Sequence, residues 1–406
     1  MMLSVKSISF ILGIFSTIQI LSLANVTVFN YLLLFFVIVF FVRLKLNVKL
    51  DCFFLVSIVL SLTTIVLSVS SDLLTCSFIK NAFNSGIIYL VCLLVYLVFK
   101  SNLKSSFSFY KGFKVSCYLT LFWCFLQIIC FYLFSFNLNV VVFYDLLKIP
   151  YSQFSEDSFH PTGFYLHRAI LLPIFLFLFF SSKNLFVIVS VSIIAVLSKS
   201  TTLIILLFLS FILLYHSQII NLRRLYSPKF ISYTLIFIFA FILILLSTNY
   251  VQDIVFYVFE RITDSTSNKA DNSSVVHFLY YYNFPVIFYD IGFIYELLGS
   301  GFGTSGFFYT LFNGQYRDMS YWIVESDYIN IIINQGLIGA VVFYSFLIRL
   351  CIIAYQKSFK RTFFFLLITL LAGIFYNLQF NWFILVEFSL YFLMINNIDP
   401  FNLKKY

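Results

Sequence analysis

Charged residues are scarce in this 406-residue chain. Only 10% of its residues are Asp, Glu, Lys or Arg, whereas 62% are hydrophobic. A water-soluble protein of this length needs a largely polar exterior, even when its core is large, so the composition excludes an ordinary soluble domain. Apolar windows long enough to cross about 30 Å of hydrocarbon recur along the chain. The composition therefore predicts a protein embedded in a lipid bilayer.

Cysteine and histidine are also rare, with 7 and 4 residues respectively. The sequence contains no Cys-x-x-Cys pair and no Cys/His cluster with metal-ligand spacing, so we expect neither structural disulfides nor a bound metal. We also expect no cofactor. The few ionisable groups that remain are therefore the first candidates for any chemistry.

The apolar windows predict an all-α integral membrane protein, with residues 1–406 forming a single polytopic domain. About twelve transmembrane helices are expected, at residues 8–24, 27–43, 52–70, 83–99, 115–136, 168–182, 184–198, 200–216, 230–248, 328–348, 362–377 and 381–397.

The distribution of charge agrees with this set of spans. If both termini are cytoplasmic, 18 of the 25 basic residues fall in cytoplasmic segments, whereas 13 of the 16 acidic residues fall on the outer side. Basic residues in short cytoplasmic loops set the orientation of membrane proteins. The net charge of +9 therefore indicates topology rather than a nucleic-acid partner.

Two predicted outer loops are much longer than the other connections. The first covers residues 137–167 and contains the sequence His160-Pro-Thr-Gly163. The second covers residues 249–326, and its middle is too aromatic to remain in water, so we expect a helix on the outer membrane surface. Loops of this length usually have a function or are disordered. Function is therefore expected on the outer side.

A glycine cluster in the second loop has two interpretations. Gly299, Gly301, Gly303 and Gly306 occur in the sequence LGSGFGTSG. Glycine adopts positive φ without steric cost, so the cluster predicts a sharp turn. The alternative is a nest of backbone N–H groups that approaches an anionic substrate.

Two acids stand directly before an apolar run near the end of the chain. Glu325 and Asp327 flank Ser326, and the run that follows contains Gly336 and Gly339. One interpretation is that Ser326 or Asp327 caps a helix and Glu325 is a solvated interfacial acid. The other is that Glu325 is a general base, with Asp327 as the helix cap.

The order of these motifs resembles the O-antigen polymerase (Wzy) and O-antigen ligase superfamily of bacterial inner-membrane proteins. The ligase branch has a motif of His, then Asn, Ser or Gln, nine residues and Gly-x-x-Gly. Here Glu325 occupies the His position, Ser326 follows, and Gly336-Leu-Ile-Gly339 comes after nine further residues. Because the His is absent, the polymerase branch is favoured over the ligase branch.

The resemblance implies a GT-C-like fold and a metal-independent glycosyltransferase. Such an enzyme joins oligosaccharide repeats carried on undecaprenyl diphosphate, for O-antigen or capsule, at the outer face of the inner membrane. A flippase and a chain-length regulator would be further partners. It requires a base for the acceptor hydroxyl and cations for the diphosphate leaving group. Glu325 and Asp327 are the catalytic candidates.

The candidate cations each have a second interpretation. The predicted diphosphate-binding residues are Arg168, Arg261, Lys199 and Arg317, and the predicted substrate loops contain His160, Gly163, His277, Gly301 and Gly303. Arg168 and Lys199 lie at span ends, where a membrane anchor is the alternative. Arg261 follows Glu260 and could form a surface ion pair, and the histidines could be solvated loop residues.

Transport of the same lipid-linked oligosaccharide is the competing function. A flippase is expected to have short outer loops and charged residues inside its helix bundle. Glu387 is the one acid near the middle of a predicted span, where it must face the bundle interior. Either a structural hydrogen bond or a transporter's proton path would explain it. The long outer loops favour the enzyme.

Overall fold

The computed structural model is almost entirely helical. It describes residues 4–18, 22–23, 26–43, 50–147, 161–164, 171–198, 201–219, 273–312, 326–374, 376, 378 and 381–402. Within these ranges the only β structure is an antiparallel pair of two-residue strands, β1 (Ser22–Leu23) and β2 (Val26–Thr27).

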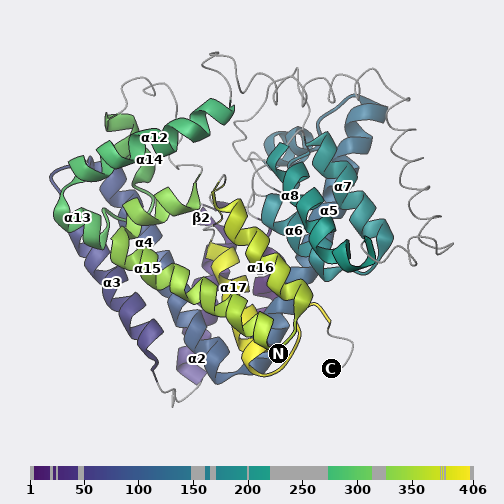
Figure 1. The fold of residues 1–406 in the computed structure, drawn as a ribbon, viewed down its shortest axis with the longest axis horizontal. Helices are drawn as coiled ribbons and strands as arrows, with labels where there is room; N and C mark the ends of the chain where they lie inside the picture. Colours follow the sequence, from purple (N-terminus) through teal and green to yellow (C-terminus); the bar gives the residue numbers. More distant parts are fainter. Residues whose placement is uncertain are drawn as a thin grey trace. The chain divides into compact units, whose positions relative to one another are not determined.

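The helices follow one another along the whole described chain (Figure 1). They are α1 (Val5–Phe15), α2 (Val28–Arg43), α3 (Cys52–Val69), α4 (Cys76–Ser101), α5 (Leu103–Phe134), the π-helix η1 (Val140–Leu146), α6 (Leu171–Ser181), α7 (Leu185–Leu197), α8 (Thr201–Ile219), α12 (Ser273–Ile291), α13 (Phe293–Leu298), α14 (Ser305–Phe312), α15 (Asp327–Gln356), α16 (Lys360–Ala372) and α17 (Asn381–Ile395).

Apolar helices indicate that the protein is embedded in a membrane. Among the described residues, α3, α4, α5 and α15 are long and apolar enough to cross a bilayer, and six further apolar helices are shorter. A helix occurs at each predicted span except 230–248, which lies outside the described residues. The presence of helices at these positions is therefore confirmed. That the chain crosses the membrane twelve times stays a prediction.

The first predicted span is longer than the helix that forms there. Helix α1 ends at Phe15, although the apolar run suggested a helix to residue 24. The Ser16 hydroxyl donates to the Gly13 carbonyl at 2.6 Å, and the Thr17 hydroxyl bonds the hydroxyls of Ser116 and Thr120 on α5. These polar side chains direct the chain toward α5, and the helix ends.

The chain divides into two compact units. Unit 1 combines residues Met1–Thr120 with His277–Tyr406, and unit 2 is Leu121–Val276. In unit 1, α4 packs against α2, α3 and α17, and α15 packs against α3, α16 and α17. In unit 2, helices α6, α7 and α8 pack against one another.

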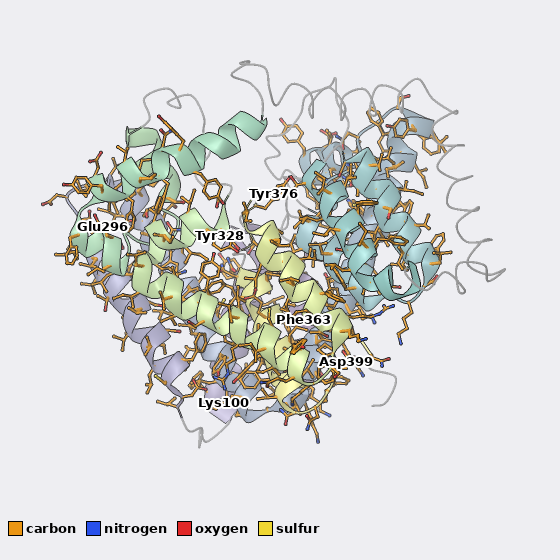
Figure 2. The ribbon with its side chains drawn as sticks, in the orientation of Figure 1. Lys100, Glu296, Tyr328, Phe363, Tyr376 and Asp399 are labelled. Carbon is orange, nitrogen blue, oxygen red and sulfur yellow. The ribbon has the colours of Figure 1, made fainter. Side chains whose placement is uncertain are left out.

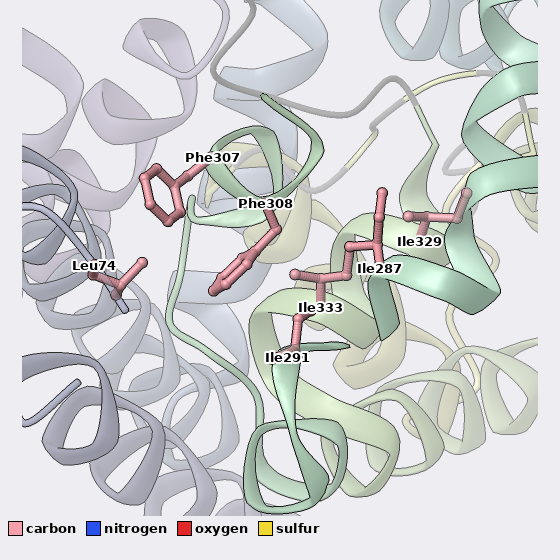
Figure 3. Close-up of a cluster of buried hydrophobic side chains, with 7 residues drawn as sticks. All are labelled: Leu74, Ile287, Ile291, Phe307, Phe308, Ile329 and Ile333. Atoms are coloured by element: carbon pink, nitrogen blue, oxygen red, sulfur yellow. The ribbon is translucent and has the colours of Figure 1, made fainter. Parts of the chain in front are cut away.

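Three helices of the predicted second outer loop pack onto α15. Helix α13 contacts α15 and α3, and α14 contacts α15. Figure 3 shows the buried apolar cluster that holds α12 and α14 against α15 and the α3–α4 connection, formed by Leu74, Ile287, Ile291, Phe307, Phe308, Ile329 and Ile333. The other face of α12 is open, with 69% of Tyr282 and 80% of Tyr289 exposed. An apolar inner face and an aromatic outer face are typical of a helix that lies in the membrane interface.

Candidate functional site

Several predicted site residues lie outside the described residues. Glu325, Arg168, Arg261, Lys199, Arg317 and His160 belong to this group. His277 lies in α12, but the placement of its side chain is not described. Asp327, Gly163, Gly301 and Gly303 are described. The site is therefore built from Asp327 and the glycine segments.

Helix α15 is broken at Gly336. This residue has φ +69° and ψ 177°, which separates the helix into the segments 327–335 and 337–356. A Cβ at this position would meet the backbone of Leu297 and would lie 2.5 Å from the Gly299 nitrogen. Only glycine combines this backbone conformation with such a close approach. The break therefore lies where the α13–α14 turn crosses the helix.

The glycine turn that follows α13 bonds to the C-terminal end of the first α15 segment. Gly299, Gly301 and Gly303 all have positive φ. The Ser300 N–H donates to the Ile333 carbonyl at 2.9 Å, and the Gly301 N–H donates to the Asn334 carbonyl at 3.1 Å. The break leaves carbonyls without helical partners, and the turn supplies donors for them. These two N–H groups thus bind protein carbonyls rather than an external anion.

Two asparagines complete the attachment of the turn. Asn334 Oδ1 accepts from the N–H groups of Thr304 at 3.1 Å and Ser305 at 3.0 Å. Asn330 Oδ1 accepts from the Ser305 hydroxyl at 2.5 Å and from Asn334 Nδ2 at 2.8 Å. All four side chains are buried. The helical spacing of Asn330 and Asn334 therefore places both on the face that holds the start of α14.

Asp327 is the first residue of α15 and is bound to the α16–α17 connection. Its N–H donates to the Gly373 carbonyl, and its Oδ1 accepts from the Leu378 N–H, both at 2.8 Å. Only 7% of its surface is exposed. The residue in the N-cap position is Ser326, so the expectation that Asp327 caps the helix is wrong. Its carboxylate instead reaches across to another part of unit 1.

Tyr281 links α12 to the same point. Its hydroxyl donates to the Ile374 carbonyl at 2.6 Å and lies 2.8 Å from Ser326 Oγ. Burial raises the pKa of the Tyr281 hydroxyl; the hydrogen bond with Ser326 opposes this, and the nearby Asp327 carboxylate adds to it. Tyr281 therefore stays protonated at neutral pH and keeps its role as a donor. Ser326 consequently bonds Tyr281 and does not cap α15 with its side chain.

A small cavity with a mainly apolar lining and a few polar groups lies beside Asp327. Its polar walls are the side chains of Asp327, Tyr328, Tyr344, Thr369 and Glu387. Its volume is close to that of roughly one water molecule. Glu387 is 4% exposed, and both its Oε2 and the Tyr344 hydroxyl are buried without a hydrogen-bond partner. Figure 2 shows Tyr328 near the start of α15, where its hydroxyl donates to the Leu370 carbonyl of α16 at 2.8 Å.

Sequence reasoning identified Glu387 but missed Tyr281, Tyr328 and Tyr344. The chain contains 28 tyrosines, and most positions in a membrane protein suit an aromatic ring. The sequence offered only their spacing along the helix from Asp327 as a sign that some of these tyrosines lie near it. Helical spacing does not distinguish a tyrosine that lines a cavity from one that faces lipid.

The His-Pro-Thr-Gly motif lies in unit 2, where residues 161–164 are described. The Gly163 N–H donates to Gln127 Oε1 at 2.9 Å, and its carbonyl accepts from Asn139 Nδ2 at 3.0 Å. The Trp123 indole donates to Asn139 Oδ1 at 2.8 Å and stacks on Phe164. The C-terminal part of α5 and the start of η1 therefore fix this turn.

Comparisons with protein-family models and with curated proteins find no match to this chain. Function must therefore be argued from the site. Its chemistry is that of a buried carboxylate at a helix start, a small cavity that this carboxylate shares with a second carboxyl, and a glycine turn bonded to a broken membrane helix.

Proposed function

We propose that this membrane protein is a metal-independent polysaccharide polymerase. It would join oligosaccharide repeats carried on undecaprenyl diphosphate into O-antigen or capsule at the outer face of the bacterial inner membrane, with both termini cytoplasmic. The glycine turn and the acid-Gly-x-x-Gly segment, which are consecutive motifs of the resemblance, lie in direct contact through Asn330 and Asn334. That contact is the observation that carries the proposal.

In the proposed reaction, an acceptor hydroxyl attacks the anomeric carbon of the donor repeat. The bond from that carbon to the diphosphate oxygen breaks, and the lipid diphosphate leaves. Glu325 accepts the hydroxyl proton, and Asp327 anchors the adjacent helix start to the α16–α17 connection. Arg168 and Arg261, with Lys199 and Arg317, stabilise the negative charge that develops on the diphosphate.

Transport of the lipid-linked repeat is the second candidate, and two observations favour it. Helix α15 is discontinuous within an apolar run, and Glu387 is buried near the middle of α17. Broken helices and buried ionisable groups are typical of transporters. The ligase alternative shares the chemistry of the polymerase and differs in its acceptor.

Reconstitution of the purified protein with lipid-linked repeats separates these candidates. A polymerase converts the repeats into a ladder of longer chains, whereas a transporter moves them across the vesicle membrane without lengthening them. Conversion only in the presence of lipid A core would indicate a ligase. Failure to form a ladder with active lipid-linked donor would overturn the proposal.

The arginine variants test the diphosphate site within the same assay. Arg168→Ala and Arg261→Ala should abolish the ladder, and the corresponding Lys variants should restore only part of it, because Lys lacks the planar fork that binds phosphate bidentately. Glu296→Gln removes a charge on α13 and is the control for a general effect of losing a charged side chain. Normal ladders from both Ala variants would refute this assignment.

A further inference from the structure

The cavity beside Asp327 contains polar groups that the proposed reaction does not use. Glu387 lies on α17, Tyr344 on the second segment of α15, and Thr369 on α16. The Glu387 Oε2 and the Tyr344 hydroxyl have no hydrogen-bond partner. A buried polar atom without a partner costs about 1–3 kcal/mol, so a membrane protein rarely carries two of them beside one cavity without a ligand.

The size of the cavity and the polar groups in its walls determine which ligand it can hold. The volume suits roughly one water molecule. A buried water needs two to four polar partners, and the walls offer the Tyr344 hydroxyl, the Glu387 carboxyl and the Asp327 carboxylate. Among the described residues, no three His, Cys, Asp or Glu side chains gather, so a metal would lack ligands here. Water is the ligand that fits.

Among the described residues, no cation pairs with Glu387. The titratable groups that approach it from the packed helices are Asp327, Tyr328, Tyr344 and Cys351 of α15 and Tyr89 of α4. Within the described part of the chain, Glu387 forms no ion pair. Two carboxyls that share a small buried cavity cannot both carry charge without a large desolvation and repulsion cost. One proton must therefore remain in the cavity.

We propose that Asp327 and Glu387 form a water-bridged carboxyl pair that shares one proton, and that Glu387 carries this proton in the resting state. The inference does not depend on the polymerase reaction. Glu387 lies among apolar residues of α17, whereas Asp327 is stabilised by the Leu378 N–H at 2.8 Å and by its position in the first turn of α15. The negative charge is thus better accommodated on Asp327, and the neutral acid is Glu387.

Transfer across the pair is chemically balanced. The Glu387 O–H bond breaks as its proton passes to the bridging water, and the water gives one of its own protons to an Asp327 oxygen. The products are a Glu387 carboxylate, the same water and a neutral Asp327 carboxyl, with no change in net charge. The Tyr344 hydroxyl positions the water. A buried carboxyl would thereby act as a proton store for a carboxylate at the start of α15.

Infrared spectroscopy of the purified full-length protein tests the pair. At neutral pH the wild type should show the C=O band of a protonated carboxylic acid, which shifts in deuterated water. Glu387→Gln should remove this band, and the control Glu296→Gln should leave it. Tyr344→Phe and Asp327→Asn should each shift the band, because the C=O group loses part of its hydrogen-bonded network.

Each contrary result is decisive. Absence of a neutral-pH band would show that Glu387 is ionised and would overturn the proposal. A band that persists in Glu387→Gln would assign the proton to another acid and overturn it too. A band that shifts in neither Tyr344→Phe nor Asp327→Asn would mean that no water bridges Glu387 to these side chains and would overturn the proposal. Tyr344→Phe changes only one oxygen, so it keeps the test usable if Glu387→Gln does not fold.

Discussion

Gly299 and Gly336 lie backbone to backbone: the Gly299 nitrogen occupies space that a side chain on Gly336 would need, and the Asn334–Gln335 backbone just before Gly336 occupies space that a side chain on Gly299 would need. A Cβ on Gly336 would lie 2.5 Å from the Gly299 nitrogen, and a Cβ on Gly299 would lie 2.5 Å from the Gln335 Cα. Both residues have positive φ. The turn after α13 and the break in α15 therefore require each other, although their residues are far apart in the sequence.

Replacement of Gly336 by Ala should destabilise the protein. Positive φ with ψ near 180°, as Gly336 has, costs a residue with a Cβ about 1–3 kcal/mol, and the clash with the Leu297–Gly299 backbone adds to this. Gly292→Ala is the matched control, because Gly292 also has positive φ but a Cβ added there would meet nothing within 4 Å. Thermal unfolding in detergent should show a much larger loss of Tm for Gly336→Ala. Equal losses would mean that the close approach contributes nothing.

Replacement of Asn334 by Ala should destabilise the protein more than the loss of one exposed side chain would. Asn334→Ala leaves the buried Ser305 N–H without its acceptor and leaves the Thr304 N–H with only its longer bond to the Gly301 carbonyl, at 3.4 Å. An unsatisfied buried group costs about 1–3 kcal/mol. In contrast, Asn396 is exposed, directly follows α17, and its side chain bonds the Phe392 carbonyl at the end of that helix. Thermal unfolding should therefore show a large loss of Tm for Asn334→Ala and little change for Asn396→Ala. Comparable losses would contradict the role of Asn334 in attaching the glycine turn to α15.

The sequence predicted the positions of the helices better than their internal shape. Hydropathy depends only on composition within a window, so it located helices near 52–70, 83–99 and 328–348. It could not reveal the break at Gly336, because the apolar run is continuous there. The break depends on the Leu297–Gly299 backbone, which a window around Gly336 does not include.

The candidate site could likewise be predicted only in part. Glu387 was identifiable, since an acid in the middle of an apolar run must be buried in protein. Its proximity to Asp327 was not, because it depends on how α15 and α17 pack. The role of Asp327 was also misjudged, since helix capping is a local pattern and the Leu378 N–H that its carboxylate binds belongs to a distant connection.

The ion pair of Asp51 with Lys100 gives a pH-dependent contribution to stability. Burial by itself would raise the pKa of Asp51, but hydrogen bonds from Lys100, the Phe54 N–H and Tyr96 lower it, so the pKa of the folded state lies below the ordinary value of the group. A carboxyl with a depressed pKa stabilises the folded state above its unfolded pKa, and this stabilisation is lost as the pH falls through the folded pKa.

Asp51→Asn should therefore lower Tm at pH 7 and have progressively less effect as the pH falls below about 4, because the carboxyl protonates there in the unfolded state and, at its lower pKa, in the folded state. The effect should be modest, because the pair is partly exposed to solvent. Unfolding scans of both proteins between pH 3 and 7 measure it, with Asp72→Asn as an exposed control. A difference that is independent of pH would contradict an electrostatic origin.

The native cysteines provide a test of the predicted topology. Cys52 and Cys76 are both exposed, at the starts of α3 and α4. The charge distribution predicts Cys76 on the outer side and Cys52 on the cytoplasmic side. In variants that retain one cysteine, an impermeant thiol reagent should label Cys76 in intact spheroplasts and Cys52 only after lysis.

A cysteine introduced at Ser273, at the start of α12, should behave like Cys76, since residues 249–326 are predicted to lie outside. Labelling of the Ser273 variant only after lysis would refute the outer position of this segment. A reversed pattern for the two native cysteines would reverse the whole topology.

The two acids at the start of α15 should respond differently to loss of charge. Glu325→Gln preserves size and hydrogen bonding but removes basicity, so ladder formation should fall about 10²-fold or more while the lipid-linked donor still binds. Asp327→Asn should retain substantial activity, because its remaining side-chain oxygen can still accept from the Leu378 N–H and hold the helix start. The measurement is the initial rate of ladder formation by purified variants with matched Tm values. A dead Asp327→Asn beside a near-normal Glu325→Gln would assign the base to Asp327, and normal rates in both would leave these acids with a structural role only.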